Sequence, residues 1–292
     1  MIISNIIGGL GNQMFQYAVG RAISLKLHVP LKLDTRDFSA YQLHQGFELD
    51  RLFNCNAEIA TNNDLTHLLS WQKAKLAQKL LRKPQLKSFR LKNLVVEPDF
   101  NYWSGINQLE GNKYLYGYWQ SEKYFIELAE NIREDFTFKL PLSDKNLEIT
   151  ELISQVNAVS LHVRRGDYVA NTNTANTHGV CSLAYYRNAI RFIAEKVKHP
   201  YFFMFSDDIE WVKNNLEVSF PHIYVSHNVG VESYNDMRIM SMCMHHIIAN
   251  SSFSWWGAWL NTNPNKIVIS PEKWFAKSVD TSDLIPKSWI KL

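Results

Sequence analysis

Residues Ala158–Tyr168 read AVSLHVRRGDY, an apolar run followed by two arginines, a glycine and an aspartate. The apolar part has the length and composition of a buried β-strand, so we expect the charged part at its carboxyl end. Arginine is always charged and its planar guanidinium binds phosphate oxygens two at a time, which suits a diphosphate. Gly166 lets the backbone approach a ligand. The stretch therefore predicts an anion site, the alternative being that one arginine pairs with Asp167 and the other points to solvent.

Four more short apolar runs follow along the chain. We expect them to be strands at residues 201–205, 223–225, 247–249 and 267–269, with helical segments between them and a helix at 144–156 before them. This alternation favours a parallel sheet covered by helices on both faces, where ligands bind beyond the carboxyl ends of the strands. The polar residues expected at that edge are Arg164, Arg165, Asp167, Ser206, Asp207, Asp208, Ser226, His227, Asn250, Ser251 and Ser252.

Residues 250–260, NSSFSWWGAWL, form the last of these strand-to-helix junctions. Serines at a helix start offer hydroxyl and backbone donors, and the helix dipole favours a phosphate there. The alternative is that the serines are plain helix caps. The tryptophans are expected to be core residues that fix the helix against the sheet.

Asp207 and Asp208 permit two interpretations. Carboxylates at a strand end can hold Mg²⁺ or Mn²⁺ on a nucleotide diphosphate. Alternatively, one of them caps a helix at residues 209–215. We favour the cap and expect no metal, because the arginines and serines already supply the charge that a metal would bring.

The amino-terminal half begins with a strand expected at residues 2–7, the turn GGLGNQ at 8–13, a helix, and a second strand at 31–34. A glycine-rich turn before a helix is a place where a backbone can approach a ligand. It is a weak nucleotide fingerprint, because Met14 replaces the third glycine of a dinucleotide motif and no Lys-Ser/Thr pair follows. The alternative is a tight turn with Asn12 capping the helix.

Two later segments of this half are also informative. A helix is expected at residues 63–81, and residues 73–92 contain eight Lys or Arg and no acid. This basic stretch is either a solvated helix face, which we favour, or a patch that contacts anionic lipid, at roughly 1 kcal/mol per charge near the surface. Residues 114–122, YLYGYWQSE, are expected to form a strand ending in polar groups, whose aromatics either stack on sugar rings or fill the core.

The bulk composition limits the function further. At 292 residues the chain suits one large or two ordinary domains, and a net charge of +3 does not indicate nucleic acid as a partner. Cys55, Cys181 and Cys243 have no metal-ligand spacing and indicate a reducing compartment. The first seven residues do not resemble a signal peptide, and no apolar run approaches the ~20 residues that span a bilayer.

These segments together resemble the bacterial type of α-1,2-fucosyltransferases of glycosyltransferase family 11. The resemblance covers nearly the whole chain and rests on GGLGNQMFQYA (8–18), GYWQSEKYF (117–125), HVRRGDY (162–168), FSDD (205–208) and NSSFSWWGAWL (250–260). It implies an α/β fold of GT-B type, with two Rossmann-like domains facing a central cleft. Residues 1–143 would bind the acceptor and residues 144–292 GDP-fucose, with a C-terminal tail that packs back on the first domain.

The resemblance also implies an activity, that of a galactoside 2-alpha-L-fucosyltransferase. Such an enzyme transfers L-fucose from GDP-β-L-fucose to the 2-hydroxyl of a terminal β-galactoside, with inversion and without a metal or cofactor. The product would be an α-1,2 linkage on an oligosaccharide or a surface glycan, as in O-antigen biosynthesis. The expected location is the cytoplasm, with peripheral contact at the inner face of the cell membrane if the basic stretch binds lipid. The acceptor and the oligomeric state are not indicated.

Site residues are carried over by position from the same motifs. Arg164 resembles the arginine that binds the diphosphate, Asp236 lies where a carboxylate binds the guanine ring, and the residues of the glycine turn would face the sugar. The full set of expected donor-binding residues is His162, Arg164, Arg165, Asp207, Asp236, Asn250, Ser251, Ser252, Phe253, Gly11 and Asn12.

Catalysis also needs a group that takes the proton of the acceptor hydroxyl. Asp167 and His178 are the candidates beside Arg164, although Asp167 would alternatively orient Arg164, and the motifs supply no further base.

Other functions fit parts of the sequence. One is a metal-dependent glycosyltransferase that uses Asp207 and Asp208. Another is a non-catalytic carbohydrate- or nucleotide-binding protein, suggested by the 13% aromatic content. Protein O-fucosyltransferases and nodulation-type α-1,6 enzymes share the arginine motif, but the tryptophan-rich segment and the opening glycine turn favour the α-1,2 type.

Overall fold

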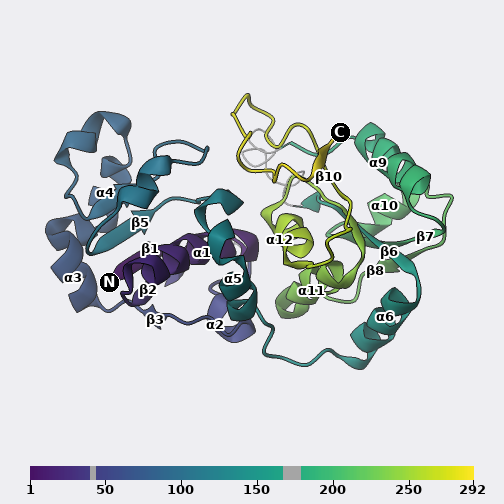
Figure 1. Ribbon diagram of the computed structural model, residues 1–292, viewed down its shortest axis with the longest axis horizontal. Helices are drawn as coiled ribbons and strands as arrows, with labels where there is room; N and C mark the ends of the chain where they lie inside the picture. Colours follow the sequence, from purple (N-terminus) through teal and green to yellow (C-terminus); the bar gives the residue numbers. More distant parts are fainter. Residues whose placement is uncertain (40–43, 167–178) are drawn as a thin grey trace. The chain divides into compact units, whose positions relative to one another are not determined.

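The computed structural model of the protein describes residues 1–39, 44–166 and 179–292 (Figure 1). The chain forms two compact units, one of Met1–Lys139 with Asp280–Leu284 and one of Leu140–Val279 with Ile285–Leu292. Each unit is built on a parallel sheet with helices packed on it. The α/β class that the sequence predicts is therefore confirmed.

The sheet of the first unit has the strand order β3-β2-β1-β5-β4. Its strands are β1 (Ile2–Asn5), β2 (Leu31–Asp34), β3 (Glu58–Ile59), β4 (Leu94–Val96) and β5 (Lys113–Tyr116). The α-helices of this unit are α1 (Leu10–Leu27), α2 (Leu49–Leu52), α3 (Asn62–Leu69), α4 (Lys75–Leu81) and α5 (Ala129–Asp135). Its 3-10 helices are η1 (Arg36–Ser39), η2 (Ser70–Lys73), η3 (Pro84–Phe89), η4 (Ser104–Gln108), η5 (Glu122–Tyr124) and η6 (Ile126–Leu128).

One apolar layer of the first unit is formed by side chains of the sheet, α3 and α4. Its buried members include Ile3, Leu65, Leu68, Leu94 and Tyr114. Fully burying one leucine of this kind stabilises the fold by roughly 1.5–3 kcal/mol. This packing fixes the strands whose carboxyl ends carry the polar residues of the unit.

The prediction of a single helix at residues 63–81 is wrong, because helix α3 ends at Leu69 and a separate helix, α4, begins at Lys75. Ser70 has a left-handed φ of 50°, and η2 separates α3 from α4. The buried side chain of Gln72 holds this break, since it donates to the carbonyl of Phe89 at 2.8 Å and accepts from the N–H of Leu91 at 3.1 Å. Helical periodicity did not indicate this contact between segments distant in sequence.

The sheet of the second unit has the strand order β11-β10-β9-β6-β7-β8, and all its pairs are parallel. Its strands are β6 (Asn157–Val163), β7 (Pro200–Ser206), β8 (His222–Val225), β9 (His245–Ile247), β10 (Val268–Ser270) and β11 (Ile290–Lys291). Its helices are α6 (Asp144–Gln155), α9 (Leu183–Lys196), α10 (Ile209–Asn215), η7 (Gly230–Glu232), α11 (Tyr234–Met242) and α12 (Ser252–Leu260). The five strands expected here are all present, with ends shifted by one to two residues.

The central strand β6 separates two apolar layers, because successive side chains of a strand point to opposite faces. Val159, Leu161 and Val163 pack against α9 and α10. Ala158 packs on the other face, against α6 and α11. By this alternation His162 belongs to the second face and reaches the end of the strand there.

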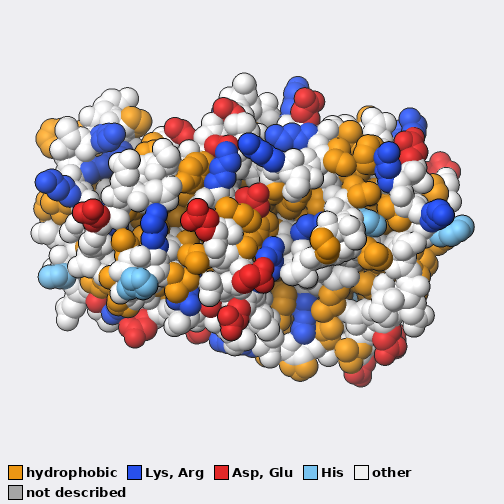
Figure 2. Space-filling model, in the orientation of Figure 1, with side chains coloured by type: hydrophobic (Ala, Val, Ile, Leu, Met, Phe, Trp, Pro, Cys, Tyr) orange, Lys and Arg blue, Asp and Glu red, His pale blue; other side chains and the backbone are white. Residues whose placement is uncertain are grey.

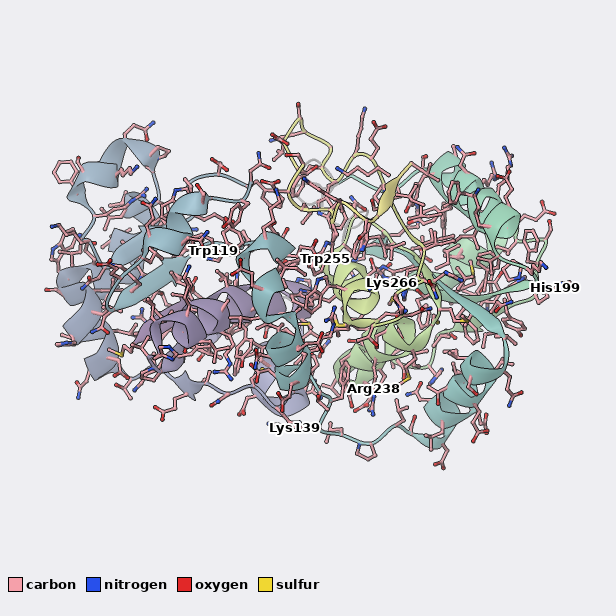
Figure 3. The ribbon with its side chains drawn as sticks, viewed as in Figure 1. Trp119, Lys139, His199, Arg238, Trp255 and Lys266 are labelled. Atoms are coloured by element: carbon pink, nitrogen blue, oxygen red, sulfur yellow. The ribbon has the colours of Figure 1, made fainter. Side chains whose placement is uncertain are left out.

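Helix α12 is anchored by its tryptophans, as the sequence predicts. Trp255, Trp256 and Trp259 are 0%, 0% and 3% exposed, and the rings of Trp255 and Trp259 stack with centroids 6.1 Å apart. Figure 3 labels Trp255 on this helix. Nζ of Lys266 donates to the carbonyls of Ala258 and Asn261 at 2.7 and 2.6 Å. A cation at a helix C-terminus is favoured by the helix dipole, so Lys266 holds this end of α12 in place.

On the face that Figure 2 shows, Lys and Arg side chains lie among acidic and apolar ones and do not merge into one patch.

Of the helices in the described part of the chain, none combines the length and apolar character needed to cross a membrane.

Candidate functional site

Arg164 and Asp207 lie at the carboxyl ends of β6 and β7, which are neighbouring parallel strands. Nη1 of Arg164 is 3.1 Å from Oδ2 of Asp207, and the N–H of Arg165 donates to Oδ1 of Asp207 at 2.8 Å. The side chains of Arg164 and Asp207 each keep 24% of their surface exposed. Asp207 thus orients the guanidinium of Arg164 while part of its surface stays accessible to an anion.

Gly166 allows the loop after β6 to pass close to Asp207. A Cβ at this position would lie 2.8 Å from Oδ2 of Asp207, which is closer than real Cβ atoms come to another heavy atom. We expected Gly166 to let the backbone approach a ligand. It also lets the backbone approach the carboxylate of Asp207.

Arg165 is held differently from its neighbour. Its guanidinium carbon lies 3.6 Å from the ring centroid of Trp211, and its Nε is 3.7 Å from Oδ2 of Asp208. This cation–π contact packs Arg165 on α10. The two arginines of the motif thus have different surroundings.

Asp208 caps α10, which confirms the interpretation that we favoured for one of the two aspartates. Its Oδ1 accepts from the N–H of Trp211 at 3.2 Å, and its own N–H donates to Oγ of Ser206 at 3.0 Å. Both carboxylates of the pair are therefore engaged, Asp207 with Arg164 and Asp208 with the helix.

His162 links the end of β6 to the start of α12. Its side chain is buried, and its ring centroid lies 6.0 Å from that of Phe253. Burial lowers the pKa of His162 below its ordinary value; the Asp207 carboxylate opposes this shift and the charge of Arg164 supports it, so the imidazole is neutral at neutral pH. Since β6 and β9 are adjacent parallel strands, Arg164 and the start of α12 lie at one edge of one sheet.

The start of α12 is capped by Ser251, the role that we gave as the alternative to phosphate binding. Its Oγ accepts from the N–H of Phe253 at 3.3 Å, and Ser252 is the first residue of the helix. Asn250 is buried, and its Nδ2 donates to the carbonyls of Gly179 and Trp274 at 3.2 and 3.1 Å. Asn250 therefore fixes the backbone before the helix, at the end of α12 where the helix dipole favours an anion.

Asp236 lies in the first turn of α11. Its Oδ1 accepts from Nδ2 of Asn228 at 2.8 Å, and Asn228 exchanges further hydrogen bonds with Asn146. Burial raises the pKa of Asp236 to about 7. Such a carboxyl gains much from a ligand that donates hydrogen bonds to its charged form.

In the first unit, Asn12 does not cap α1, so that alternative is wrong. The helix begins at Leu10 with Gly9 as the N-cap and no side-chain cap, which places Gly11 and Asn12 inside its first turn. Oδ1 of Asn12 instead accepts from Nε2 of Gln120 at 2.7 Å. Two of the sequence motifs, the glycine turn and GYWQSEKYF, are thereby joined.

Comparison with known proteins adds to this geometry. The model of the family described as Glycosyl transferase family 11 matches residues 1–292. The chain belongs to glycosyltransferase family 11. It is similar to an alpha-1,2-colitosyltransferase of Escherichia coli, with 38% identity over 100% of this chain and 99% of that protein. It is also similar to the O-antigen biosynthesis glycosyltransferase WbnK of Escherichia coli, with 34% identity over 99% of both proteins.

The fold of this family 11 glycosyltransferase has solved counterparts. A crystal structure of NodZ alpha-1,6-fucosyltransferase soaked with GDP-fucose superposes with a TM-score of 0.53 at 14% identity, over 89% of this chain and 91% of that one. The likeness confirms the expected GT-B type of fold.

Two site residues proposed from the sequence, Asp167 and His178, lie outside the residues that the structure of this glycosyltransferase describes. Sequence reasoning also missed two residues. Asn228 was not singled out, although it follows β8 and bonds Asp236. Glu97 directly follows β4, and the signal that could have found it is an acid directly after an apolar strand.

Proposed function

We propose that the protein transfers L-fucose from GDP-β-L-fucose to the 2-hydroxyl of a terminal β-galactoside, with inversion, to form an α-1,2 linkage on a surface polysaccharide. The observation that supports this most is the position of Arg164 and the start of α12 at the same carboxyl edge of the second sheet. Such an edge is where open α/β sheets bind nucleotides. The sequence motifs resemble those of α-1,2-fucosyltransferases, and the family supports transfer of a sugar.

In this proposal the protein stabilises the departing GDP. Breaking the fucosyl bond leaves negative charge on the pyrophosphate, and fixed donors aimed at that charge lower the barrier; losing one such donor costs on the order of 10² to 10³ in rate. Arg164, oriented by Asp207, is the fixed donor, and the positive end of the α12 dipole adds to it. Since they supply positive charge, the proposed reaction needs no divalent cation. Asp236 would accept hydrogen bonds from the guanine ring, with Asn228 holding its carboxylate.

Colitose is the second candidate for the transferred sugar. It is L-fucose without the 3-hydroxyl, and the relative with 38% identity is a colitosyltransferase. A site that hydrogen-bonds the 3-hydroxyl would disfavour colitose strongly, because the partner groups would remain unpaired, whereas a site that is apolar at this position would discriminate weakly.

The experiment that tests the proposal is a screen of galactosides, among them lactose and N-acetyllactosamine, with GDP-fucose and GDP-colitose in parallel. We expect GDP release and an α-1,2-linked product with GDP-fucose. If GDP-colitose is turned over faster than GDP-fucose, GDP-colitose becomes the proposed donor. Binding of GDP without consumption of either donor would instead favour a non-catalytic nucleotide-binding protein.

We also propose that the basic stretch contacts anionic lipid at the inner face of the membrane. Around its cations lie exposed apolar side chains, with Trp71, Leu76 and Phe89 exposed by 61%, 71% and 65%. Cations next to exposed aromatic and aliphatic groups are the combination that binds the lipid interface. Some of the cations are engaged within the protein, as Lys75 is with Asp37, but Lys79, Lys83 and Lys87 form no ion pair with any described residue.

A further inference from the structure

The first unit contains a cavity at the carboxyl edge of its sheet. Its volume is about 250 Å³, on the scale of one sugar ring. It lies where β1, β4 and β5 end, which is the edge at which parallel sheets bind ligands. Its lining residues are Asn5, Ile7, Arg82, Val96, Glu97, Tyr116, Gly117 and Tyr118.

Glu97 is the acid of this cavity and is fixed from one side. Its Oε2 accepts from the N–H of Tyr118 at 2.7 Å, and its Oε1 accepts from the N–H of Trp119 at 2.8 Å. The turn that aims these two N–H groups places Trp119 at a φ of 57°. It also needs Gly117, because a Cβ there would lie 2.4 Å from Cβ of Glu97.

The carboxylate keeps capacity for a ligand. Each carboxylate oxygen has two acceptor positions, and the protein fills one on each. The residue is only partly buried and lines the cavity, so the remaining positions are open to a hydroxyl donor. Burial raises the pKa of Glu97 to about 7, so its charged form lacks stabilisation that such a donor would give.

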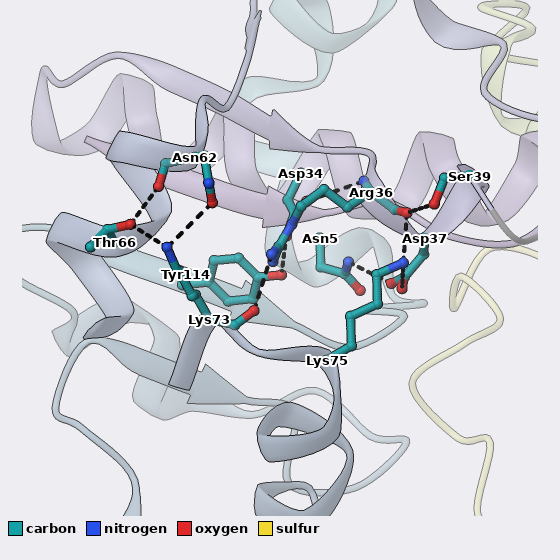
Figure 4. A network of polar contacts seen from close by, with 10 residues as sticks. All are labelled: Asn5, Asp34, Arg36, Asp37, Ser39, Asn62, Thr66, Lys73, Lys75 and Tyr114. Carbon is teal, nitrogen blue, oxygen red and sulfur yellow. Dashed lines mark hydrogen bonds and ion pairs between the residues drawn. The ribbon is translucent and has the colours of Figure 1, made fainter. Parts of the chain in front are cut away.

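Asn5 gives a second and independent indication of a ligand. It is 3% exposed, and its Nδ2 donates to Oδ2 of Asp37 at 3.1 Å (Figure 4). Its Oδ1 is buried and has no hydrogen-bond partner among the described residues. A buried carbonyl oxygen without a donor costs free energy, about 1–3 kcal/mol, unless a ligand or water supplies one.

The wall that carries Asn5 is rigid. Asp37 pairs with Lys75, whose Nζ also donates to the carbonyl of Arg36 at 2.7 Å. Asp34 accepts from Arg36 and, at 2.7 Å, from the hydroxyl of Tyr114. Burial alone would raise the pKa of Asp34, but these hydrogen bonds outweigh it and hold the pKa below its ordinary value. The network in Figure 4 therefore holds the side chain of Asn5 in one orientation.

The other walls offer a cation and an aromatic face. The guanidinium carbon of Arg82 lies 4.7 Å from the ring centroid of Tyr116. The side chain of Tyr118 is 45% exposed. A pyranose presents hydroxyls on its rim and C–H groups on its faces, so an acid, an amide oxygen, a guanidinium and an exposed aromatic ring around one cavity match it.

We propose that this cavity binds the galactose ring of the acceptor, with Glu97 and Asn5 accepting hydrogen bonds from ring hydroxyls and Tyr118 covering its apolar face. The proposal rests on the proposed function, because it assigns the substrate of that reaction to this unit. Arg82 donates to a further oxygen of the sugar.

The test is binding of methyl β-galactoside to the full chain without donor, measured by saturation-transfer NMR, with GDP binding measured calorimetrically on the same samples. We expect Glu97→Gln to weaken galactoside binding at least tenfold, and Arg82→Met and Tyr118→Ala to weaken it severalfold. Glu110→Gln is the matched control, since this exposed acid precedes the amino end of β5 and the cavity follows its carboxyl end. GDP binding should not change in any variant.

Arg82→Met and Tyr118→Ala alter exposed side chains, so they report on the cavity even if Glu97→Gln disturbs the turn that it holds. Wild-type galactoside affinity in both variants, or no galactoside binding by a wild-type protein that binds GDP, would overturn this inference and leave the donor site intact. Failure of the wild type to bind GDP would instead refute the proposed function.

Discussion

The guanidinium of Arg164 lies 3.1 Å from the carboxylate of Asp207, across the ends of two adjacent parallel strands. This pairing orients the guanidinium, whose planar fork suits the oxygens of a phosphate. Lysine would keep the charge but not the fork. We therefore expect Arg164→Lys to reduce kcat with GDP-fucose by about 10² or more, the cost of losing a positioned donor.

The control for this variant is Arg187→Lys, the same substitution on the exposed side of α9. It should leave kcat and KM unchanged. Near-normal turnover of Arg164→Lys would show that charge alone suffices, and the role assigned to the guanidinium would be lost.

Metal independence can be checked on the same assay. Asp207 is engaged by Arg164 and Asp208 by the N-terminus of α10, so we expect excess EDTA to leave turnover within about twofold of the untreated rate. Activity that collapses in EDTA and returns with Mn²⁺ would support the metal-dependent alternative.

Much of the second unit was predictable from the sequence, because its strands are short apolar runs that end in polar residues. A parallel sheet buried on both faces needs such runs, and parallel strands bring their carboxyl ends to one edge. This is why Arg164, Asp207 and Ser252 could be assigned to one region. The ends of the strands were less predictable. The fourth strand was expected to begin at residue 247, but β9 begins at His245, because buried histidines take part in it.

The first unit was less predictable, because its key contacts join residues far apart in the chain. Asn12 resembles a helix cap in sequence, yet its partner is Gln120, 108 residues away. Gln72 breaks an otherwise helical pattern through bonds to Phe89 and Leu91. Glu97 becomes notable only when the turn at Gly117 folds onto it. Local patterns do not report such pairings.

Binding to vesicles tests the role of the basic stretch. Replacing Lys79, Lys83 and Lys87 with alanine should weaken sedimentation with anionic vesicles by about a hundredfold, from roughly 1 kcal/mol per charge. Salt should weaken the wild-type interaction similarly. The control variant replaces three exposed lysines of the second unit, Lys145, Lys196 and Lys198. Equal wild-type binding to anionic and neutral vesicles would argue that the stretch is a solvated surface.

Proton linkage tests the proposed contact between Asp236 and guanine. The pKa of Asp236 is raised to about 7 without ligand, and the ring N–H donors of guanine would lower it by stabilising the carboxylate. Affinity for GDP-fucose should therefore rise between pH 6 and pH 8, with proton release near pH 6.5. This ligand is suitable because its pyrophosphate diester does not titrate in that range. Asp236→Asn should bind more weakly and without this pH dependence, whereas an unchanged slope would exclude Asp236 as its source.

Stability should depend on pH through the same carboxyl group. In the unfolded chain the pKa of Asp236 returns towards 3.8, so the folded state binds the proton more tightly. The free energy of unfolding contributed by this group is therefore fully present below about pH 4 and is lost as pH rises through about 7. Urea unfolding of the ligand-free protein at pH 5 and pH 8 measures this loss.

Asp236→Asn should show a smaller decrease in the free energy of unfolding between pH 5 and pH 8, because burial of a neutral amide does not change with pH. Asp144→Asn, an exposed carboxyl at the start of α6, should keep the wild-type decrease. An Asp236→Asn protein that loses as much stability as the wild type would mean that this carboxyl is already ionised in the folded protein at pH 5.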